Sequence, residues 1–264
     1  MTVTLPTKAT PSPTAAATPV LRVDEVSKVF GHGKAAVSAL ERISLHVERG
    51  QFVCLVGASG CGKSTVLHLL AGLDSPTSGS VAVEGRTALM FQEAALFPWL
   101  TVAGNVALAL RLRGVRRGER PALVASLLEM MHLEGFGTRQ PHELSGGMRQ
   151  RVALARALAQ DADVLLMDEP FGSLDAMTRD LLHAELERLW TDRRFSVLFV
   201  THNVREAVRL ADRVLVLTSR PGRVSTAFDV DIPRPRRIET PAVSALAGEI
   251  TEQLSMEVRR HGRS

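Results

Sequence analysis

Two stretches near the beginning of the chain alternate hydrophobic and polar residues, which is typical of half-buried β-strands. These stretches are residues 21–26 and 43–47. In residues 51–56 the apolar side chains are instead nearly continuous and stop at Gly57, which predicts a strand buried on both faces. The run that follows, residues 64–73, has the spacing of apolar positions that indicates a helix.

The rest of the chain also alternates between predicted strands and helices. We expect strands at 81–83, 87–91, 164–167, 196–200 and 214–217, and helices near 176–191 and 204–210. Residues 102–158 differ, because most of their apolar positions follow a helical period. Strands and helices that alternate around a helical stretch predict an α/β fold with a parallel sheet and an inserted helical subdomain.

The two ends of the chain differ from the middle. Residues 1–19 hold six Thr and four Pro, and they show neither the apolar segment nor the Arg-rich pattern of a sorting signal, so we expect a disordered tail. The sequence P-R-P-R-R at 233–237 indicates a linker. After it, one face of a helix carries Val243, Leu246, Ile250 and Leu254. We expect this helix to pack on the body, and a membrane-surface role is the less favoured alternative.

These patterns divide the chain into a disordered tail at 1–19, a main domain at 20–235 and a C-terminal linker and helix at 236–264. The helical subdomain spans about 94–158. The composition of 45% hydrophobic and 23% charged residues is ordinary for a globular protein, and it excludes a wholly disordered chain, a collagen-like fibre and a small disulfide scaffold. A net charge of +4 is too small to indicate nucleic acid by itself.

No apolar run approaches the length of about 18 residues that a membrane span needs, so any work at a membrane would require other chains that cross it. The only cysteines are Cys54 and Cys61, whose number and spacing fit neither a disulfide framework nor a zinc site.

Residues 57–65 read G-A-S-G-C-G-K-S-T and match the phosphate-binding pattern G-x-x-x-x-G-K-[ST] between a predicted strand and a predicted helix. Small residues let successive backbone N–H groups curl around a phosphate, and the helix N-terminus adds about half a positive charge. Lys63 would contact the β- and γ-phosphates, and the Ser64 hydroxyl would bind Mg²⁺. The predicted nucleotide-binding residues here are Gly57, Ala58, Ser59, Gly60, Cys61, Gly62, Lys63, Ser64 and Thr65.

Cys61 lies inside this loop, where a helix N-terminus can lower the pKa of a thiol. We expect Cys61 to react faster than Cys54, which lies in a predicted buried strand. For the function of Cys61, we favour the simpler interpretation that it is a small residue with no chemical role.

Two carboxylates follow a predicted buried strand at the point where it ends. Asp168 and Glu169 come directly after residues 164–167. A phosphate loop requires an acidic partner on a neighbouring strand, so we expect Asp168 to bind Mg²⁺, through water, and Glu169 to act as the general base on an attacking water. The alternative is a solvated surface pair, which is less favoured because charges rarely end a buried strand without a partner.

Further motifs make the pattern specific. Residues 144–151, L-S-G-G-M-R-Q-R, resemble the signature sequence of the ATP-binding cassette family and stand 24 residues before Asp168. Gln92 resembles the Q-loop glutamine, residues 173–175 resemble the D-loop, and His202 resembles the switch histidine. The match runs from about residue 21 to residue 223. It implies a P-loop NTPase with a RecA-like parallel-sheet core, an N-terminal antiparallel β subdomain and an inserted helical subdomain.

The resemblance also implies an ATPase that works as a head-to-tail homodimer with two ATP molecules at the interface. In such a dimer Ser145, Gly146 and Gly147 begin a helix whose N-terminus would bind the γ-phosphate on the partner. Asp175 joins the predicted nucleotide-binding residues. The implied catalytic residues are Glu169, His202 and Gln92, and the implied metal ligands are Ser64, Gln92 and Asp168.

The chain departs from the family at the position that stacks on adenine. Family members usually place a Tyr there, and this chain contains no Tyr. Phe30 is the obvious substitute, because it keeps the π-face and lacks only the hydroxyl. A core Phe at a strand end is the alternative.

The segment after Gln92 continues with F-P-W-L-T-V at 97–102, and in the family this region contacts the membrane-spanning subunit. Trp99 is typical of an interface, whereas Leu96 and Leu100 could equally pack in the core. The sequence at 97–102, together with residues 220–223 and 233–236, is similar to the sequences of importers of nitrate, sulfonates and taurine.

The resemblance therefore implies a peripheral ATPase subunit that uses ATP and Mg²⁺ on the cytoplasmic face of the inner (plasma) membrane. It would energise the import of a small anionic solute of the nitrate, sulfonate or taurine class. Its partners would be a second copy of itself, membrane-spanning permease subunits and, indirectly, a solute-binding protein, with no nucleic acid. The alternative is a soluble cassette ATPase with a nucleic-acid or ribosomal partner. It is disfavoured because the chain holds one cassette with a short insertion, and a P-loop kinase is disfavoured by Ser145–Gly147 and His202.

Overall fold

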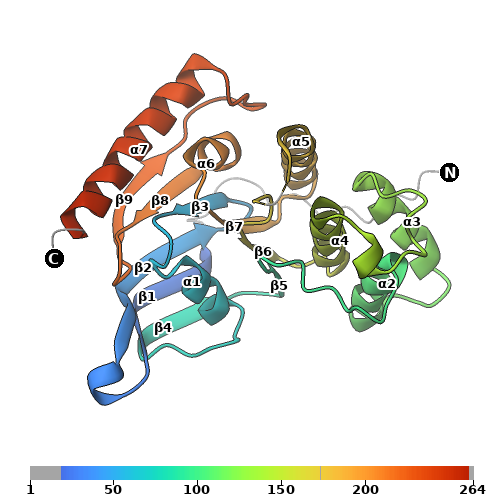
Figure 1. Cartoon of the computed structure of the whole chain (residues 1–264), viewed down its shortest axis with the longest axis horizontal. Coiled ribbons are helices and arrows are strands. Elements are labelled where there is room, and N and C mark those ends of the chain that lie inside the picture. The colour runs from blue at the N-terminus through green and yellow to red at the C-terminus, as the bar shows by residue number, and fades with distance from the viewer. Residues whose placement is uncertain (1–18, 173, 262–264) are drawn as a thin grey trace.

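The computed structural model describes residues 19–172 and 174–261 (Figure 1). Residues 1–18 of the predicted tail lie outside the described residues, and so does Ser173. Among the helices that the structure describes, none combines the length and the apolar character that a membrane span requires.

An antiparallel sheet with the strand order β2-β1-β4 forms one part of the molecule. Its strands are β1 (Pro19–Phe30), β2 (Val37–Glu48) and β4 (Ser78–Val83), and a short 3₁₀ turn, η1 (Gly33–Ala35), connects the first two. Strands β1 and β2 are about twice as long as the alternating stretches predicted from the sequence. The alternation is interrupted at Glu25 and Arg42, which adopt positive φ angles of 46° and 45°, and the register of β1 against β2 shifts between Val23 and Val26.

A six-stranded sheet with the order β5-β6-β7-β3-β8-β9 forms the centre. Its strands are β3 (Phe52–Val56), β5 (Thr87–Met90), β6 (Val164–Asp168), β7 (Ser196–Thr201), β8 (Arg213–Leu217) and β9 (Val224–Asp229). The strands from β5 to β8 are parallel, and only β9 is antiparallel to its neighbour. Every residue of β3, β6 and β7 is buried, as expected for strands covered on both faces.

Helices pack on the parallel sheet. These are α1 (Lys63–Leu70), α5 (Ala176–Arg193), α6 (Val204–Leu210) and the C-terminal α7 (Pro241–His261). Helix α1 ends three residues earlier than predicted, and the turn after it contains Gly72 with a φ of 69°. Residues between β5 and β6 form α2 (Val102–Leu112), α3 (Arg120–Met130), the short η2 (Pro141–Glu143) and α4 (Gly146–Ala159), which gather on the side away from β1, β2 and β4 (Figure 1).

Helix α7 packs against α6 through the apolar face predicted from the sequence. Val243 and Ile250 are fully buried, and Leu246 and Leu254 pack against the same core. The segment before the helix, predicted to be a linker, is fixed to the body. Arg236 is only 5% exposed and donates hydrogen bonds to the backbone carbonyls of Ile232, Val208, Ala211 and Val230. This burial lowers the pKa of Arg236 to about 10.

Candidate active site

The phosphate loop lies between the end of β3 and the start of α1. Gly60 and Gly62 adopt positive φ angles of 74° and 98°, which only glycine takes up readily. A Cβ atom on Gly62 would lie 2.6 Å from a methyl group of Leu40, so the turn has no room for a larger residue. The Lys63 ammonium donates hydrogen bonds to the carbonyls of Gly57 and Ala58, both at 2.9 Å. The loop therefore curls around the charged end of its own lysine.

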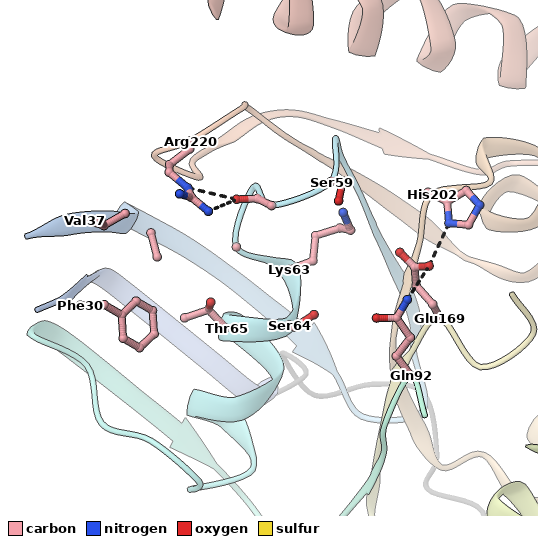
Figure 2. Close-up of a pocket in the computed structure, with 13 residues that line it drawn as sticks. Phe30, Val37, Ser59, Lys63, Ser64, Thr65, Gln92, Glu169, His202 and Arg220 are labelled. Atoms are coloured by element: carbon pink, nitrogen blue, oxygen red, sulfur yellow. Dashed lines mark hydrogen bonds and ion pairs between the residues drawn. The ribbon is translucent and has the colours of Figure 1, made fainter. Parts of the chain in front are cut away.

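A pocket of about 410 Å³ opens beside this loop (Figure 2). Its volume lies within the range that accommodates small-molecule ligands. The structure brings ten of the sequence-predicted residues together in the pocket lining, namely Phe30, Ser59, Gly60, Gly62, Lys63, Ser64, Thr65, Gln92, Glu169 and His202. These residues come from β1, the phosphate loop, the end of β5, the end of β6 and the end of β7, so the topology of the two sheets creates the pocket.

Glu169 connects the polar residues at one side of the pocket (Figure 2). Its Oε2 atom lies 3.0 Å from His202 Nδ1 and accepts a longer hydrogen bond of 3.5 Å from Gln92 Nε2. The Glu169 backbone adopts a left-handed φ of 44°, which costs a residue with a Cβ atom roughly 1–2 kcal/mol. Its N–H donates to the carbonyl of Val200 on the neighbouring strand. The backbone is thus held in a strained conformation at the position predicted to be the general base.

Asp168 ends strand β6 and is 6% exposed, and it does not itself line the pocket. Burial raises the pKa of Asp168, and so does the Glu169 carboxylate, whereas a hydrogen bond with the Ser64 side chain lowers it. A hydroxyl and a carboxylate are hard oxygen donors, which suit Mg²⁺. No group of three or more His, Cys, Asp or Glu that could hold a metal is found in residues 19–172 and 174–261. The Ser64 hydroxyl and the Asp168 carboxylate are suited to a cation that also takes ligands from substrate phosphates.

Phe30 is 45% exposed at the end of β1 and lines the pocket on the side away from Glu169 (Figure 2). The alternative that Phe30 is a core residue is therefore wrong. The Lys28 ammonium lies 5.0 Å from the centroid of the Phe30 ring, and it also pairs with Asp74 at 2.5 Å. The exposed ring gives the pocket one flat apolar wall, which a base could stack against.

Seven of the predicted nucleotide-binding residues do not line this pocket: Gly57, Ala58, Cys61, Ser145, Gly146, Gly147 and Asp175. Ser145 caps the N-terminus of α4, where its Oγ accepts a hydrogen bond from Met148 N at 3.2 Å. Asp175 caps α5 by accepting hydrogen bonds from the Thr178 N–H and hydroxyl, and these bonds lower its pKa. Both residues thus begin helices outside the pocket of their own chain.

The structure supports the favoured interpretation of Cys61 as a small residue with no chemical role, and that it reacts faster than Cys54 stays a prediction. Cys61 is 1% exposed, and burial raises the pKa of its thiol although the Lys63 ammonium acts in the opposite direction. A Cβ atom on Gly57 would lie 2.7 Å from the Cys61 sulfur, so the side chain fills the inside of the loop. Proximity to a helix N-terminus is here outweighed by the loss of solvation.

Three lining residues were not predicted: Val37, Ala39 and Arg220. Val37 and Ala39 lie in the part of β2 that precedes the interruption at Arg42, where the alternating pattern does not extend. Arg220 lies between β8 and β9 and donates from Nε and Nη2 to the carbonyl of Gly60, both at 3.4 Å. The sequence of residues 220–223 indicates only a similarity to importers, and no sequence signal places Arg220 beside the phosphate loop.

The family "ABC transporter" matches residues 40–172 of the chain, which is half of its length. The chain belongs to the ABC transporter family. Proteins of this family that bind ATP in importers hydrolyse it, so this chain is an ATPase, and the predicted family and fold class are confirmed.

Individual members of the ABC transporter family are similar to the chain over most of its length. The nitrate import ATP-binding protein NrtD of Synechocystis is 46% identical over 221 residues, which cover 81% of this chain and 83% of NrtD. The aliphatic sulfonates import ATP-binding protein SsuB of Bacillus licheniformis is 41% identical over 244 residues, which cover 88% and 92%. A dimeric structure of the ATP-binding cassette MJ0796, bound to ADP and Pi after hydrolysis, matches with a TM-score of 0.74 and 30% identity. It covers 81% of this chain and all of the other.

Proposed function

We propose that this ABC ATPase supplies the energy for import of a small anionic solute of the nitrate, sulfonate or taurine class. The names of NrtD and SsuB, which cover more than four fifths of this chain, support the solute class. Residues 20–235 are the ATPase domain, its helical subdomain spans about 94–158, and residues 236–264 are a C-terminal extension. The chain works on the cytoplasmic face of the inner membrane, bound to permease subunits that receive the solute from a binding protein. No nucleic acid takes part.

The pocket residues have complementary roles in ATP hydrolysis. The Phe30 ring stacks on the adenine, the loop N–H groups surround the β-phosphate, and the Lys63 ammonium moves from the carbonyls of its own loop to the phosphates. Ser64, Gln92 and, through water, Asp168 would hold Mg²⁺. When bound, the ion neutralises phosphate charge. Glu169 accepts the proton of the attacking water, and the 3.0 Å contact with His202 keeps its carboxylate oriented.

The signature residues serve the second copy in a head-to-tail dimer. Ser145, Gly146 and Gly147 form the N-terminus of α4, which does not line the pocket of its own chain. Its free N–H groups are suited to the γ-phosphate on the partner, and Asp175 begins the neighbouring α5 at the same interface. The dimeric assembly of the similar cassette MJ0796 supports this arrangement.

The observation that carries the transport proposal is an exposed aromatic pair that follows Gln92 by a few residues in the sequence. Trp99 is 71% exposed and lies 5.4 Å from the Phe97 ring, whereas ordinary surface loops rarely present two aromatic side chains to water. We call residues 93–100 the docking loop. Fully buried Asn105 fixes this loop through hydrogen bonds with the backbone of Phe97, Leu100 and Thr101.

The docking loop and Gln92 are both hydrogen-bonded to helix α4. Arg156 donates to the carbonyls of Ala94 and Ala95 at 3.1 and 2.8 Å, and Gln150 donates to the carbonyl of Gln92. A force on Trp99 therefore reaches Gln92 through a short, hydrogen-bonded segment. This geometry suits a chain that senses a membrane-spanning partner and controls hydrolysis in response.

Uptake by the assembled transporter tests the proposal. We expect vesicles whose ATPase faces the lumen, made with the permease and this chain and given the binding protein outside, to take up nitrate, an alkanesulfonate or taurine only when MgATP is enclosed in the lumen. Lys63→Ala removes the ammonium that neutralises the phosphates, so it should abolish both uptake and detectable ATPase activity. Active ATPase without uptake of any of the three solutes would contradict the solute class, and normal hydrolysis by Lys63→Ala would contradict the site.

A further inference from the structure

A compact turn at residues 218–223 connects β8 to β9 and carries Arg220. Within the turn, the Thr218 N–H donates to the carbonyl of Arg223 at 2.9 Å, and the Thr218 hydroxyl donates to the carbonyl of Pro221 at 2.9 Å. The Arg223 N–H in turn donates to the Thr218 hydroxyl at 3.0 Å. These bonds fix the backbone from which the Arg220 side chain projects.

The turn is fastened directly to the nucleotide site. The Gly222 N–H donates to the carbonyl of Ala39 at 2.9 Å, and the Gly222 carbonyl accepts from the Glu41 N–H at 3.0 Å. A Cβ atom on Gly222 would lie 2.1 Å from the carbonyl oxygen of Cys61 in the phosphate loop. No side chain fits between the two loops at this point, so Arg220 is presented to the pocket at a fixed position.

The Arg220 guanidinium lines the pocket on the side of Val37 and the phosphate loop, across from Glu169 and His202 (Figure 2). Its hydrogen bonds to the Gly60 carbonyl are both 3.4 Å long, which makes them weak. Among the residues that the structure describes, no carboxylate forms an ion pair with Arg220. Arg223, three residues further along the same turn, is paired with Glu41 at 2.6 Å.

The charges of the residues that line the pocket suggest that the Arg220 guanidinium balances part of the charge of a bound phosphate chain. Of the residues that line it, Lys63 and Arg220 carry permanent positive charge, and Glu169 is the acidic member. A nucleoside triphosphate brings about four negative charges, of which Lys63 and a bound Mg²⁺ would together balance about three. A guanidinium has five N–H donors in a planar fork and binds phosphate oxygens well.

We propose that Arg220 is a nucleotide-binding residue that exchanges its weak bonds to Gly60 for bonds to the phosphate chain of the nucleotide. It approaches from the wall formed by Val37 and Ala39, whereas Lys63 acts from inside the loop. The inference rests on the proposal that this pocket is the nucleotide site. Arg220 therefore favours binding of phosphorylated nucleotides and holds them in the open, monomeric chain before any partner arrives.

Titration calorimetry with ATP and ADP on the purified chain tests this role. Arg220→Gln removes the charge and should raise the Kd for both nucleotides about ten-fold. Arg220→Lys keeps the charge and should recover most of the affinity. Arg223→Gln is the matched control, because it removes an exposed ion pair from the same turn, and it should bind like the parent. The difference between the parent and Arg220→Gln should shrink as NaCl rises from about 0.05 M to about 0.5 M.

Two results would overturn the inference. One is parent-like affinity in Arg220→Gln. The other is an equal loss in Arg220→Lys and Arg220→Gln that does not respond to salt, which would assign Arg220 a role in holding Gly60 instead. A Lys63→Ala arm separates this failure from that of the proposed site. If Lys63→Ala loses ATP binding while Arg220→Gln keeps it, only the role of Arg220 fails, and if both keep it, the pocket is not the nucleotide site.

Discussion

At the scale of single residues, burial and backbone conformation decide the chemistry of the active site. Cys61 lies at the first turn before α1, yet it is 1% exposed and its pKa is raised by burial. Glu169, in contrast to the buried Cys61, lines the pocket, and its backbone is strained with a φ of 44°. Both conditions come from packing around the residue, and neither follows from the residue types next to it in the sequence.

The state of Cys61 leads to a labelling prediction. Because its pKa is raised, the thiol form dominates at neutral pH, and we expect a maleimide to modify folded protein at least about ten-fold more slowly than free cysteine. Labelling should accelerate as the pH rises toward the raised pKa, and both thiols should react at once in guanidinium. Mass spectrometry of Cys54→Ala and Cys61→Ala assigns the sites. Rapid modification of Cys61 in the folded chain at pH 7 would contradict the burial argument.

The phosphate-loop residues could be predicted because their pattern reports a physical requirement for small residues before a lysine at the start of a helix. Gly62 illustrates this, since its φ of 98° and its contact with Leu40 exclude any side chain. Arg220 could not be predicted in the same way. It reaches the loop only because the β8–β9 turn is bonded to β2 through Gly222, and such a contact between distant segments has no local signature.

At the scale of elements, the strands with continuous apolar runs were predicted well, whereas three of the partly exposed strands, β1, β2 and β9, were predicted too short or missed. β3 and β6 are buried throughout, so their sequences carry a clear signal. β9 has no fully buried residue and was missed. β1 and β2 were predicted too short, because positive φ angles at Glu25 and Arg42 interrupt the period of two on which the prediction depends.

The proposed role of the docking loop as an interface depends on which of its side chains are exposed. Leu96 packs partly against the core, which favours the core interpretation for this residue, while Trp99 remains 71% exposed. We expect Trp99→Ala to keep the ATPase rate of the free chain within about two-fold, and to weaken assembly with the permease by roughly 2 kcal/mol or more, as loss of an aromatic anchor does. Pull-down with the permease and ATPase assays measure the two effects.

Leu112→Ala is the matched control for Trp99→Ala, because Leu112 is 79% exposed in the same helical subdomain but lies outside the docking loop. It should assemble normally. If Trp99→Ala also assembles and transports like the parent, the coupling surface lies elsewhere. If Trp99→Ala instead impairs the ATPase of the isolated chain, the effect comes from the structure of the loop and the interface proposal is wrong.

At the scale of the whole molecule, the order of motifs was enough to predict the family, which the match over residues 40–172 confirms. The alternation of strands and helices predicted the parallel sheet, which the pairing of the strands from β5 to β8 confirms. The position of the pocket relative to α4, the helix that begins with the signature residues, could not be predicted from the order of motifs. The N-terminus of α4 and the pocket are separate features of one chain, and the proposed active site becomes complete only when a second chain supplies Ser145.

Dimerisation driven by ATP tests this last step. Glu169→Gln keeps the size of the side chain but cannot accept a proton, so hydrolysis should slow by about 10²–10⁴-fold. The γ-phosphate then persists, and light scattering should show a dimer of the 28.6 kDa chain with MgATP and a monomer with ADP. Adding Ser145→Asp to the Glu169→Gln variant should return the ATP-bound protein to a monomer. Aspartate caps a helix as well as serine does, so α4 stays folded, but the charge of the aspartate repels the phosphate on the partner. Thr101→Asp in the Glu169→Gln background is the control, since Thr101 caps α2 in the same subdomain, and it should still dimerise. A dimer that forms equally well with Ser145→Asp would show that the α4 N-terminus does not face the phosphate of the second chain.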